Sequence, residues 1–234
     1  MTQPLALVTG AAHRLGKAFA LTLAQRGFAV GLHYHTTSPD ATIQVIHELG
    51  VPAYPLQADL TDPAQIESLF ADIAALPHTL AVLVNSAAVM SRSDIRTITP
   101  DEWSAVMDLN LRAPLACSQR AAQLMDSGLI VNLSDVGAHK AWSGYPAYVV
   151  SKAALEVQTR LLARALAPKI RVNAIAPGLV LPNLPPEEWD RLTGRIPLRR
   201  AAELTEITSA LEFLLDNPYV TAQTLTIDGG YSLL

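Results

Sequence analysis

Cysteine, charge and long apolar runs are all scarce in this sequence. Cys117 is the only cysteine among 234 residues, which excludes an intrachain disulfide and fits a reducing compartment. Charged residues make up 16% and the formal net charge is −4, so the balance gives no electrostatic basis for nucleic acid or an anionic membrane as a partner. No apolar run approaches the roughly 18 residues of a membrane span, and the first residues lack the features of a signal peptide. We therefore expect a cytoplasmic protein.

Half of the residues are hydrophobic, and they follow two alternating patterns. Short β-branched runs predict strands, whereas longer segments with apolar residues at helical spacing predict helices between them. This alternation indicates a single α/β domain over residues 1–234, with a parallel sheet of about seven strands covered by helices on both faces. The expected strands are 5–9, 29–34, 53–57, 80–85, 129–134, 171–175 and 225–228; the expected helices include 16–26, 65–75, 101–125, 148–166 and 205–215.

One late segment interrupts this alternation. Five prolines lie between residues 177 and 197, where a regular helix cannot continue. An irregular excursion late in an α/β domain favours a substrate loop or lid around 178–198, although a plain surface insertion is the alternative.

The first predicted strand leads into a glycine-containing turn and a helix. Gly10 allows backbone angles that a Cβ forbids, and Gly16 lets the helix pack close to the sheet. A helix N-terminus there would present free N–H groups to a pyrophosphate. The middle glycine of a G-x-x-x-G-x-G dinucleotide loop is Arg14 here, so a strand-helix turn without a nucleotide stays an alternative.

The end of the second predicted strand bears on the choice of cofactor. An acidic residue there would bind the ribose 2′-hydroxyl of NAD, but the tip carries His33, His35 and Thr37. With Arg14, these side chains suit a 2′-phosphate, which favours NADPH; each histidine alone could equally be packed or exposed. Asp59 with the following leucine, Leu60, suits the adenine edge after the third strand, or simply begins a turn.

Tyr148 and Lys152 carry the main chemical signal. Residues i and i+4 share one face of a helix, and an ammonium beside a phenol favours the phenolate. We therefore expect Lys152 to lower the pKa of Tyr148 from about 10, so that the tyrosine transfers a proton near neutral pH. The pair opens the helix after the fifth predicted strand, at the carboxyl edge of the sheet where ligands of such folds bind.

Together these residues resemble the short-chain dehydrogenase/reductase family over essentially the whole chain. The matching positions, in order, are Thr9, Gly10, Gly16, Asp59, Leu60, Asn85, Asn110, Tyr148, Lys152, Asn173, Pro177, Gly178, Asp228, Gly229 and Gly230. The resemblance implies a doubly wound Rossmann domain, hydride transfer and a homotetramer. It also implies a proton relay through Asn110, Tyr148 and Lys152. Asn85, Pro177 and Gly178 would lie along the cofactor, in a site completed by His13, Leu15, Ala87 and Ser134.

Two departures from the family pattern are similar to its pteridine reductase branch, some of whose members reduce dihydrofolate or dihydromonapterin. Asp135 stands where the family has a serine, and Arg14 replaces a glycine. The resemblance implies Arg14 near the cofactor phosphates and the pterin, Asp135 and Tyr148 at the reacting ring, and Tyr145 in the pocket lining. The branch's stacking phenylalanine falls at Met90, whose thioether can still cover a flat ring.

Asp135 also carries information of its own. A serine hydroxyl donates to a carbonyl oxygen, whereas an ionised carboxylate only accepts, so Asp135 fits a substrate with N–H groups, such as an aminopterin. Alternatively, Ser134 does the serine's task and Asp135 is a surface turn residue. Trp142 and Trp189 flank the expected pocket and would cap a planar substrate, unless they serve ordinary packing.

The sequence thus predicts an NADPH-dependent reductase of a dihydropterin or dihydrofolate C=N bond, with a small molecule as its partner. A short-chain dehydrogenase acting on a ketone or alcohol is the alternative, and a nucleotide-binding regulator without turnover is a third reading. The histidines show no ligand spacing, so we expect no metal site.

Overall fold

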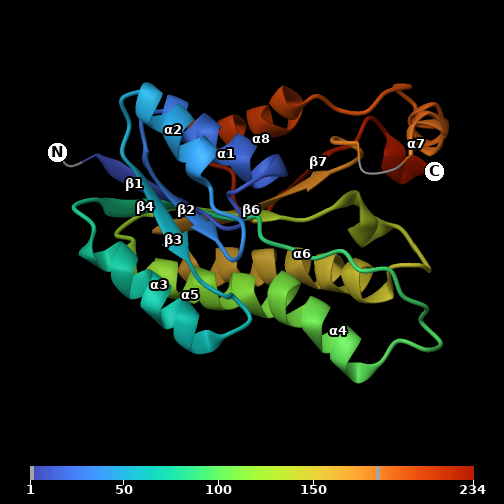
Figure 1. The fold of residues 1–234 in the computed structure, drawn as a ribbon, viewed down its shortest axis with the longest axis horizontal. Coiled ribbons are helices and arrows are strands. Elements are labelled where there is room, and N and C mark those ends of the chain that lie inside the picture. The colour runs from blue at the N-terminus through green and yellow to red at the C-terminus, as the bar shows by residue number, and fades with distance from the viewer. Residues whose placement is uncertain (1–2, 183–184) are drawn as a thin grey trace.

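The computed structural model describes residues 3–182 and 185–234, which form a single Rossmann-like α/β domain (Figure 1). A seven-stranded parallel sheet runs in the order β3-β2-β1-β4-β5-β6-β7. The strands are β1 (Pro4–Val8), β2 (Ala29–Tyr34), β3 (Ala53–Gln57), β4 (Thr79–Asn85), β5 (Gly128–Leu133), β6 (Ile170–Pro177) and β7 (Thr224–Ile227). The predicted fold class is confirmed.

Helices cover both faces of the sheet (Figure 1). One layer holds α1 (Arg14–Gln25), α2 (Asp40–Glu48) and α8 (Leu204–Asp216), and the other holds α3 (Pro63–Ala75), α5 (Ala113–Leu124) and α6 (Pro146–Leu166). The remaining helices are α4 (Pro100–Met107) and α7 (Pro186–Thr193), with short helical turns at Asp108–Arg112, Val136–His139 and Tyr231–Leu233. Each layer encloses its own apolar core against the sheet. Cys117 lies fully buried in the core under α3, α5 and α6.

The predicted helix 101–125 is helical from 100 to 124, but it is not a regular α-helix along its whole length. A π-helical turn, Asp108–Arg112, separates α4 from α5. Pro114 follows this turn and has no N–H to donate to the carbonyl four residues earlier, so the regular hydrogen-bond ladder cannot run through. The turn carries Asn110 inward, and π turns of this kind are frequent at functional sites.

The strand order reverses between β1 and β4, which places the switch point of the sheet at their carboxyl ends. Thr9 joins the two ends: its N–H donates to the Val84 carbonyl, and its hydroxyl oxygen accepts from the N–H groups of Ser86 and Ala87. Ligands of doubly wound sheets bind in the crevice at such a point.

The predicted substrate loop around 178–198 includes residues 183 and 184, which lie outside the described residues. The described part contains α7. Within residues 3–182 and 185–234, no helix combines the length and apolar character needed to cross a membrane.

Candidate active site

The loop between β1 and α1 is shaped by two glycines. Gly10 has φ +65°, and a Cβ on it would lie 3.0 Å from the Ala87 Cα. A Cβ on Gly16 would lie 2.1 Å from the Gly10 carbonyl oxygen. No larger side chain fits either place without moving backbone, so the loop packs closely on itself and on the segment after β4.

Arg14 begins α1 with φ +55°, in the left-handed region that glycine usually supplies. An L-residue held in that region costs of order 1–2 kcal/mol, and such strain is concentrated at functional sites. Arg14 lines both of the adjoining pockets described below. The arginine therefore keeps the backbone shape of a glycine and adds a cation between the two pockets.

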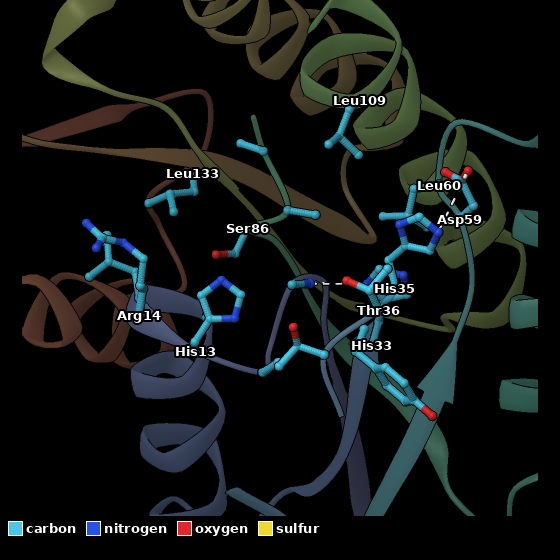
Figure 2. A pocket seen from close by; sticks show the side chains of 18 of the residues that line it. His13, Arg14, His33, His35, Thr36, Asp59, Leu60, Ser86, Leu109 and Leu133 are labelled. Carbon is cyan, nitrogen blue, oxygen red and sulfur yellow. Dashed lines mark hydrogen bonds and ion pairs between the residues drawn. The ribbon is translucent and has the colours of Figure 1, made fainter. Parts of the chain in front are cut away.

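The first pocket, of about 470 Å³, lies over the β1–α1 loop at the switch point (Figure 2). His13 and Arg14 line it beside Ser86 and Leu133, while His35, Asp59 and Leu60 lie at the other end. Most residues that the sequence assigned to a cofactor face this pocket: Gly10, His13, Arg14, Leu15, Gly16, His33, His35, Thr37, Asp59, Leu60 and Ala87.

His33 has a different task from the one expected. It is buried, its Nδ1 accepts from the Gly10 N–H at 3.1 Å, and its Nε2 lies 3.0 Å from the Ala58 carbonyl oxygen. With both nitrogens engaged, the ring has no donor left for a 2′-phosphate. Burial lowers its pKa from 6.5 to about 4, so the ring is neutral near pH 7. His33 supports the glycine loop instead.

The far end of this pocket combines a histidine and an acid. The His35 Nε2 lies 4.0 Å from the Asp59 Oδ2, and the His35 side chain is well exposed. The Asp59 carboxylate accepts from the N–H and the hydroxyl of Thr61, which together hold its pKa below the usual range. Asp59 thus shapes its own turn, the alternative that the sequence left open, while it also lines the pocket.

A second pocket, of about 330 Å³, adjoins the first and contains the expected reactive side chains. The Tyr148 hydroxyl donates to the Asp135 Oδ2 at 2.9 Å, and the Gly137 N–H donates to the Asp135 Oδ1 at 2.6 Å. The sequence-assigned residues that line this pocket are Arg14, Leu15, Met90, Ser134, Asp135, Trp142, Tyr148, Lys152, Pro177 and Gly178.

Burial dominates the protonation of this cluster. It raises the pKa of Asp135, and burial together with the neighbouring Asp135 raises the pKa of Tyr148 well above 10. Burial lowers the pKa of Lys152 to about 8, against the opposing effect of Asp135. The Lys152 Nζ donates to the Leu133 carbonyl at 2.6 Å and lies 5.7 Å from the centroid of the Tyr148 ring. The expectation that Lys152 lowers the pKa of Tyr148 is therefore wrong for this arrangement, because burial and the hydrogen-bonded Asp135 both raise that pKa.

Known proteins resemble this chain throughout its length. A family model described as Enoyl-(Acyl carrier protein) reductase matches residues 10–232. The 3-oxoacyl-[acyl-carrier-protein] reductase FabG of Staphylococcus aureus (strain Mu50 / ATCC 700699) is 32% identical over 237 residues, covering 96% of each chain. The chain belongs to the short-chain dehydrogenase/reductase family. It is therefore an NAD(P)-dependent oxidoreductase.

Solved structures of the family agree with the fold. The crystal structure of FolM alternative dihydrofolate reductase 1 from Brucella canis, complexed with NADP, has a TM-score of 0.93 and 32% identity, covering 100% of this chain and 95% of that one. A blue fluorescent protein from a metagenomic library, in complex with NADPH, has a TM-score of 0.91 and 31% identity, covering 98% of each chain.

Asn110 lines neither pocket of this short-chain dehydrogenase/reductase. Its Oδ1 accepts from the Val89 N–H at 2.8 Å, and its Nδ2 donates to the Val89 carbonyl and the Ser151 hydroxyl. Asn110 therefore joins the π turn to the pocket wall beside Met90 and to the helix of Tyr148.

Three further assigned residues lie away from the pockets. Asn85, the last residue of β4, is buried, and its side-chain amide donates to the Asn132 Oδ1 at 2.9 Å. Tyr145 packs edge-on against Trp142, with ring centroids 6.5 Å apart. Trp189 lies on α7 and is not among the lining residues. Of the three aromatic walls expected for a planar substrate, the structure brings Trp142 alone to the pocket.

Ser134 lines the second pocket, but its hydroxyl points elsewhere. It donates to the buried Glu156 Oε1 at 2.9 Å. Asp135, and not Ser134, is therefore the side chain bonded to Tyr148, which argues against the reading of Asp135 as a plain turn residue.

Sequence reasoning missed an aliphatic wall of the second pocket. It did not assign the wall residues Val89, Val136, Leu179, Val180 and Leu181. The only signal for them was their place beside Met90, Asp135 and Gly178, since apolar residues carry no chemical pattern. Among the described residues, no group of three His, Cys, Asp or Glu side chains could hold a metal ion.

Proposed function

We propose that this protein is an NADPH-dependent reductase of a dihydropterin or dihydrofolate C=N bond. The observation that carries the proposal is the 2.9 Å hydrogen bond from Tyr148 to Asp135 inside the second pocket. A carboxyl group at that place accepts from N–H groups of a substrate, which a pterin has and a simple ketone lacks. The FolM proteins of Brucella, named as alternative dihydrofolate reductases, are among the structural neighbours.

The first pocket fits a dinucleotide. The tightly packed glycine loop brings the N-terminus of α1 to the pocket floor, where its free N–H groups favour a pyrophosphate. Arg14 and His35 would stand near a 2′-phosphate, and Pro177 with Gly178 would border the nicotinamide end. The Brucella neighbours are complexed with NADP. When bound, NADPH would supply the hydride.

Tyr148 and Asp135 would supply the proton. Reduction of a C=N bond needs one proton on nitrogen, and Tyr148 is the hydroxyl donor at the pocket wall. A bare Tyr148 phenolate is disfavoured by burial and by the charge of Asp135. The raised pKa of Asp135 lets it carry a proton that it returns to Tyr148 as Tyr148 gives its own to the substrate nitrogen. For this step Asp135 starts protonated and donates to the Tyr148 oxygen. The Tyr148 O–H bond breaks as the substrate N–H bond forms, the Asp135 O–H bond breaks as a new Tyr148 O–H bond forms, and the negative charge ends on Asp135.

The alternative is reduction of a ketone, and a specific observation favours it. The aliphatic wall described above, with Met90 beside it, suits an acyl chain as well as a ring, and the FabG relatives are named as 3-oxoacyl reductases. Trp142 offers one flat wall, and Met90 replaces the aromatic residue expected in the pteridine reductase branch. A regulator without turnover is disfavoured, because Tyr148, Asp135 and Lys152 lie together in one pocket.

The deciding experiment follows NADPH oxidation with dihydrobiopterin, dihydromonapterin, dihydrofolate and a panel of ketones, including a 3-oxoacyl thioester. Wild type is compared with Asp135→Ser and with Asp72→Ser, an exposed control on α3. We expect wild type to reduce at least one pterin, Asp135→Ser to keep only a small, measurable part of that activity, and Asp72→Ser to keep it in full. Unchanged pterin reduction in Asp135→Ser, or a wild type that reduces only ketones, would overturn the proposal.

A further inference from the structure

We propose that Glu156 is a positioning residue, which holds the segment that carries Asp135 against the helix that carries Tyr148. This inference rests on the proposed function, because it gives Asp135 a part in turnover. Glu156 lies on α6, four residues beyond Lys152, and is buried. It lines neither pocket. At about 1.5 Å of rise per residue, it stands about 12 Å along the helix from Tyr148, too far to touch a substrate there.

Both oxygens of the Glu156 carboxylate are used, one at each end of the same short segment. The Ser134 hydroxyl donates to Oε1 at 2.9 Å, and the His139 Nε2 lies 3.2 Å from Oε2. Asp135 stands between these two attachment points and begins the helical turn Val136–His139. Glu156 therefore fastens the residues on both sides of Asp135 to α6.

The segment between the two attachment points has little freedom of its own. The Asp135 Oδ1 takes the Gly137 N–H, and a Cβ on Gly137 would meet the Trp142 ring at 2.7 Å. Before the segment, the Lys152 Nζ holds the Leu133 carbonyl. A movement of the attachment points would therefore move Asp135 and the Trp142 wall together, relative to Tyr148.

A carboxylate suits this place because one oxygen accepts from the Ser134 hydroxyl while the other lies 3.2 Å from the His139 ring nitrogen at the far end of the segment. A buried carboxylate is costly unless it is hydrogen-bonded or paired; the Ser134 hydroxyl supplies a hydrogen bond, and the His139 ring pairs with the other oxygen when it is protonated. Truncation of Glu156 would free both ends of the segment, while glutamine keeps an acceptor for Ser134 in the same volume.

The test is a double-mutant cycle on turnover, with whichever substrate the wild type reduces. Glu156→Ala should lower kcat by about tenfold to a hundredfold, as a displacement of about 1 Å does, with the KM for NADPH little changed. The melting temperature should fall, because the buried Ser134 hydroxyl loses its acceptor. Glu156→Gln should restore most of kcat. In the Asp135→Ser background, Glu156→Ala should change kcat less than about twofold, since a residue acting through Asp135 has nothing left to position. Glu48→Ala, an exposed glutamate at the end of α2, is the matched control.

A second readout needs no substrate and separates this inference from the proposed function. The carbon-13 chemical shift of the Asp135 carboxyl, followed against pH in the cofactor-free protein, gives the pKa of this group. Burial raises that pKa in the wild type. In Glu156→Ala the pKa should fall toward its ordinary value as water reaches the loosened segment, and in Glu156→Gln it should stay. An unchanged pKa in Glu156→Ala, or equal losses of kcat in both backgrounds, would overturn the role of Glu156. Failure of the pterin assay alone would overturn only the substrate assignment.

Discussion

Acid should loosen the glycine loop through His33. This ring is buried and neutral, with a pKa of about 4 in the folded protein against 6.5 for an ordinary histidine. Between these values the unfolded chain binds the proton and the folded chain does not, so stability rises with pH in this window. The contribution of His33 is complete above pH 6.5 and is lost as the pH falls through 4. A difference of about 2.5 in pKa, at about 1.4 kcal/mol per unit, corresponds to about 3 kcal/mol.

Urea unfolding at a series of pH values between 7 and 4 measures this loss. Other groups titrate in the same range, so the useful quantity is the difference between wild type and His33→Asn, in which an amide oxygen takes the place of Nδ1. We expect His33→Asn to be less stable at pH 7 and to approach the wild type as the pH falls. NADPH affinity should weaken over the same window, because the Gly10 N–H is bonded to this ring.

Proton NMR of the His33 ring provides the direct check. A ring that titrates near 6.5 in the folded protein, or equal pH slopes in the two proteins, would refute the assignment of His33 as a neutral support of the loop.

Four shorter predictions concern chemistry, cofactor and assembly. Tyr148→Phe should lower kcat by about 10²–10⁴-fold with little change in the Kd of NADPH, and a fully active variant would remove the proposed proton donor. Lys152→Ala should weaken both turnover and NADPH binding, since Lys152 lies in the pocket with Pro177 and Gly178; a variant with unchanged NADPH affinity would limit Lys152 to turnover. NADPH should bind more tightly than NADH, and Arg14→Gly should narrow the difference; equal affinities in the wild type would show that Arg14 does not read the 2′-phosphate. Light scattering should report a homotetramer, formed through exposed apolar side chains such as Val157, Leu161 and Phe213, and a monomer at micromolar concentration would contradict this.

The fold could be predicted from the sequence because the spacing of apolar residues within each short segment indicates whether it forms a strand or a helix. The predicted strands 29–34 and 53–57 coincide with β2 and β3, and the predicted helix 65–75 ends with α3. The interruption at Asp108–Arg112 was missed, because the apolar spacing of 101–125 runs through it. Pro114 was the available signal, but a proline near a helix start and one that widens the preceding turn look alike in sequence.

The sequence predicted which residues come together at the site better than it predicted their protonation states. Spacing brought Tyr148 and Lys152 to one face of α6, and the serine-to-aspartate change marked Asp135. Their pKa values depend on burial and on which partner is nearest. The spacing of residues in the sequence reveals neither. His33 shows the same limit: its place at a strand tip was visible, but the Ala58 carbonyl that engages it belongs to the residue that follows β3. Glu156 carried no signal, since a glutamate on a long helix is usually solvated.

The thiol of Cys117 can report how often the helix layer that covers it opens locally. Burial raises its pKa to about 12, and its side chain is sealed between the sheet and the α3, α5 and α6 layer. Alkylating reagents attack the thiolate, so the folded protein should resist them. Because the sequence has no other cysteine, every labelling event marks one opening of that layer. The rate of labelling, with and without bound nucleotide, would then measure how far occupancy of the crevice slows the opening of a core on the opposite side of the sheet from α1.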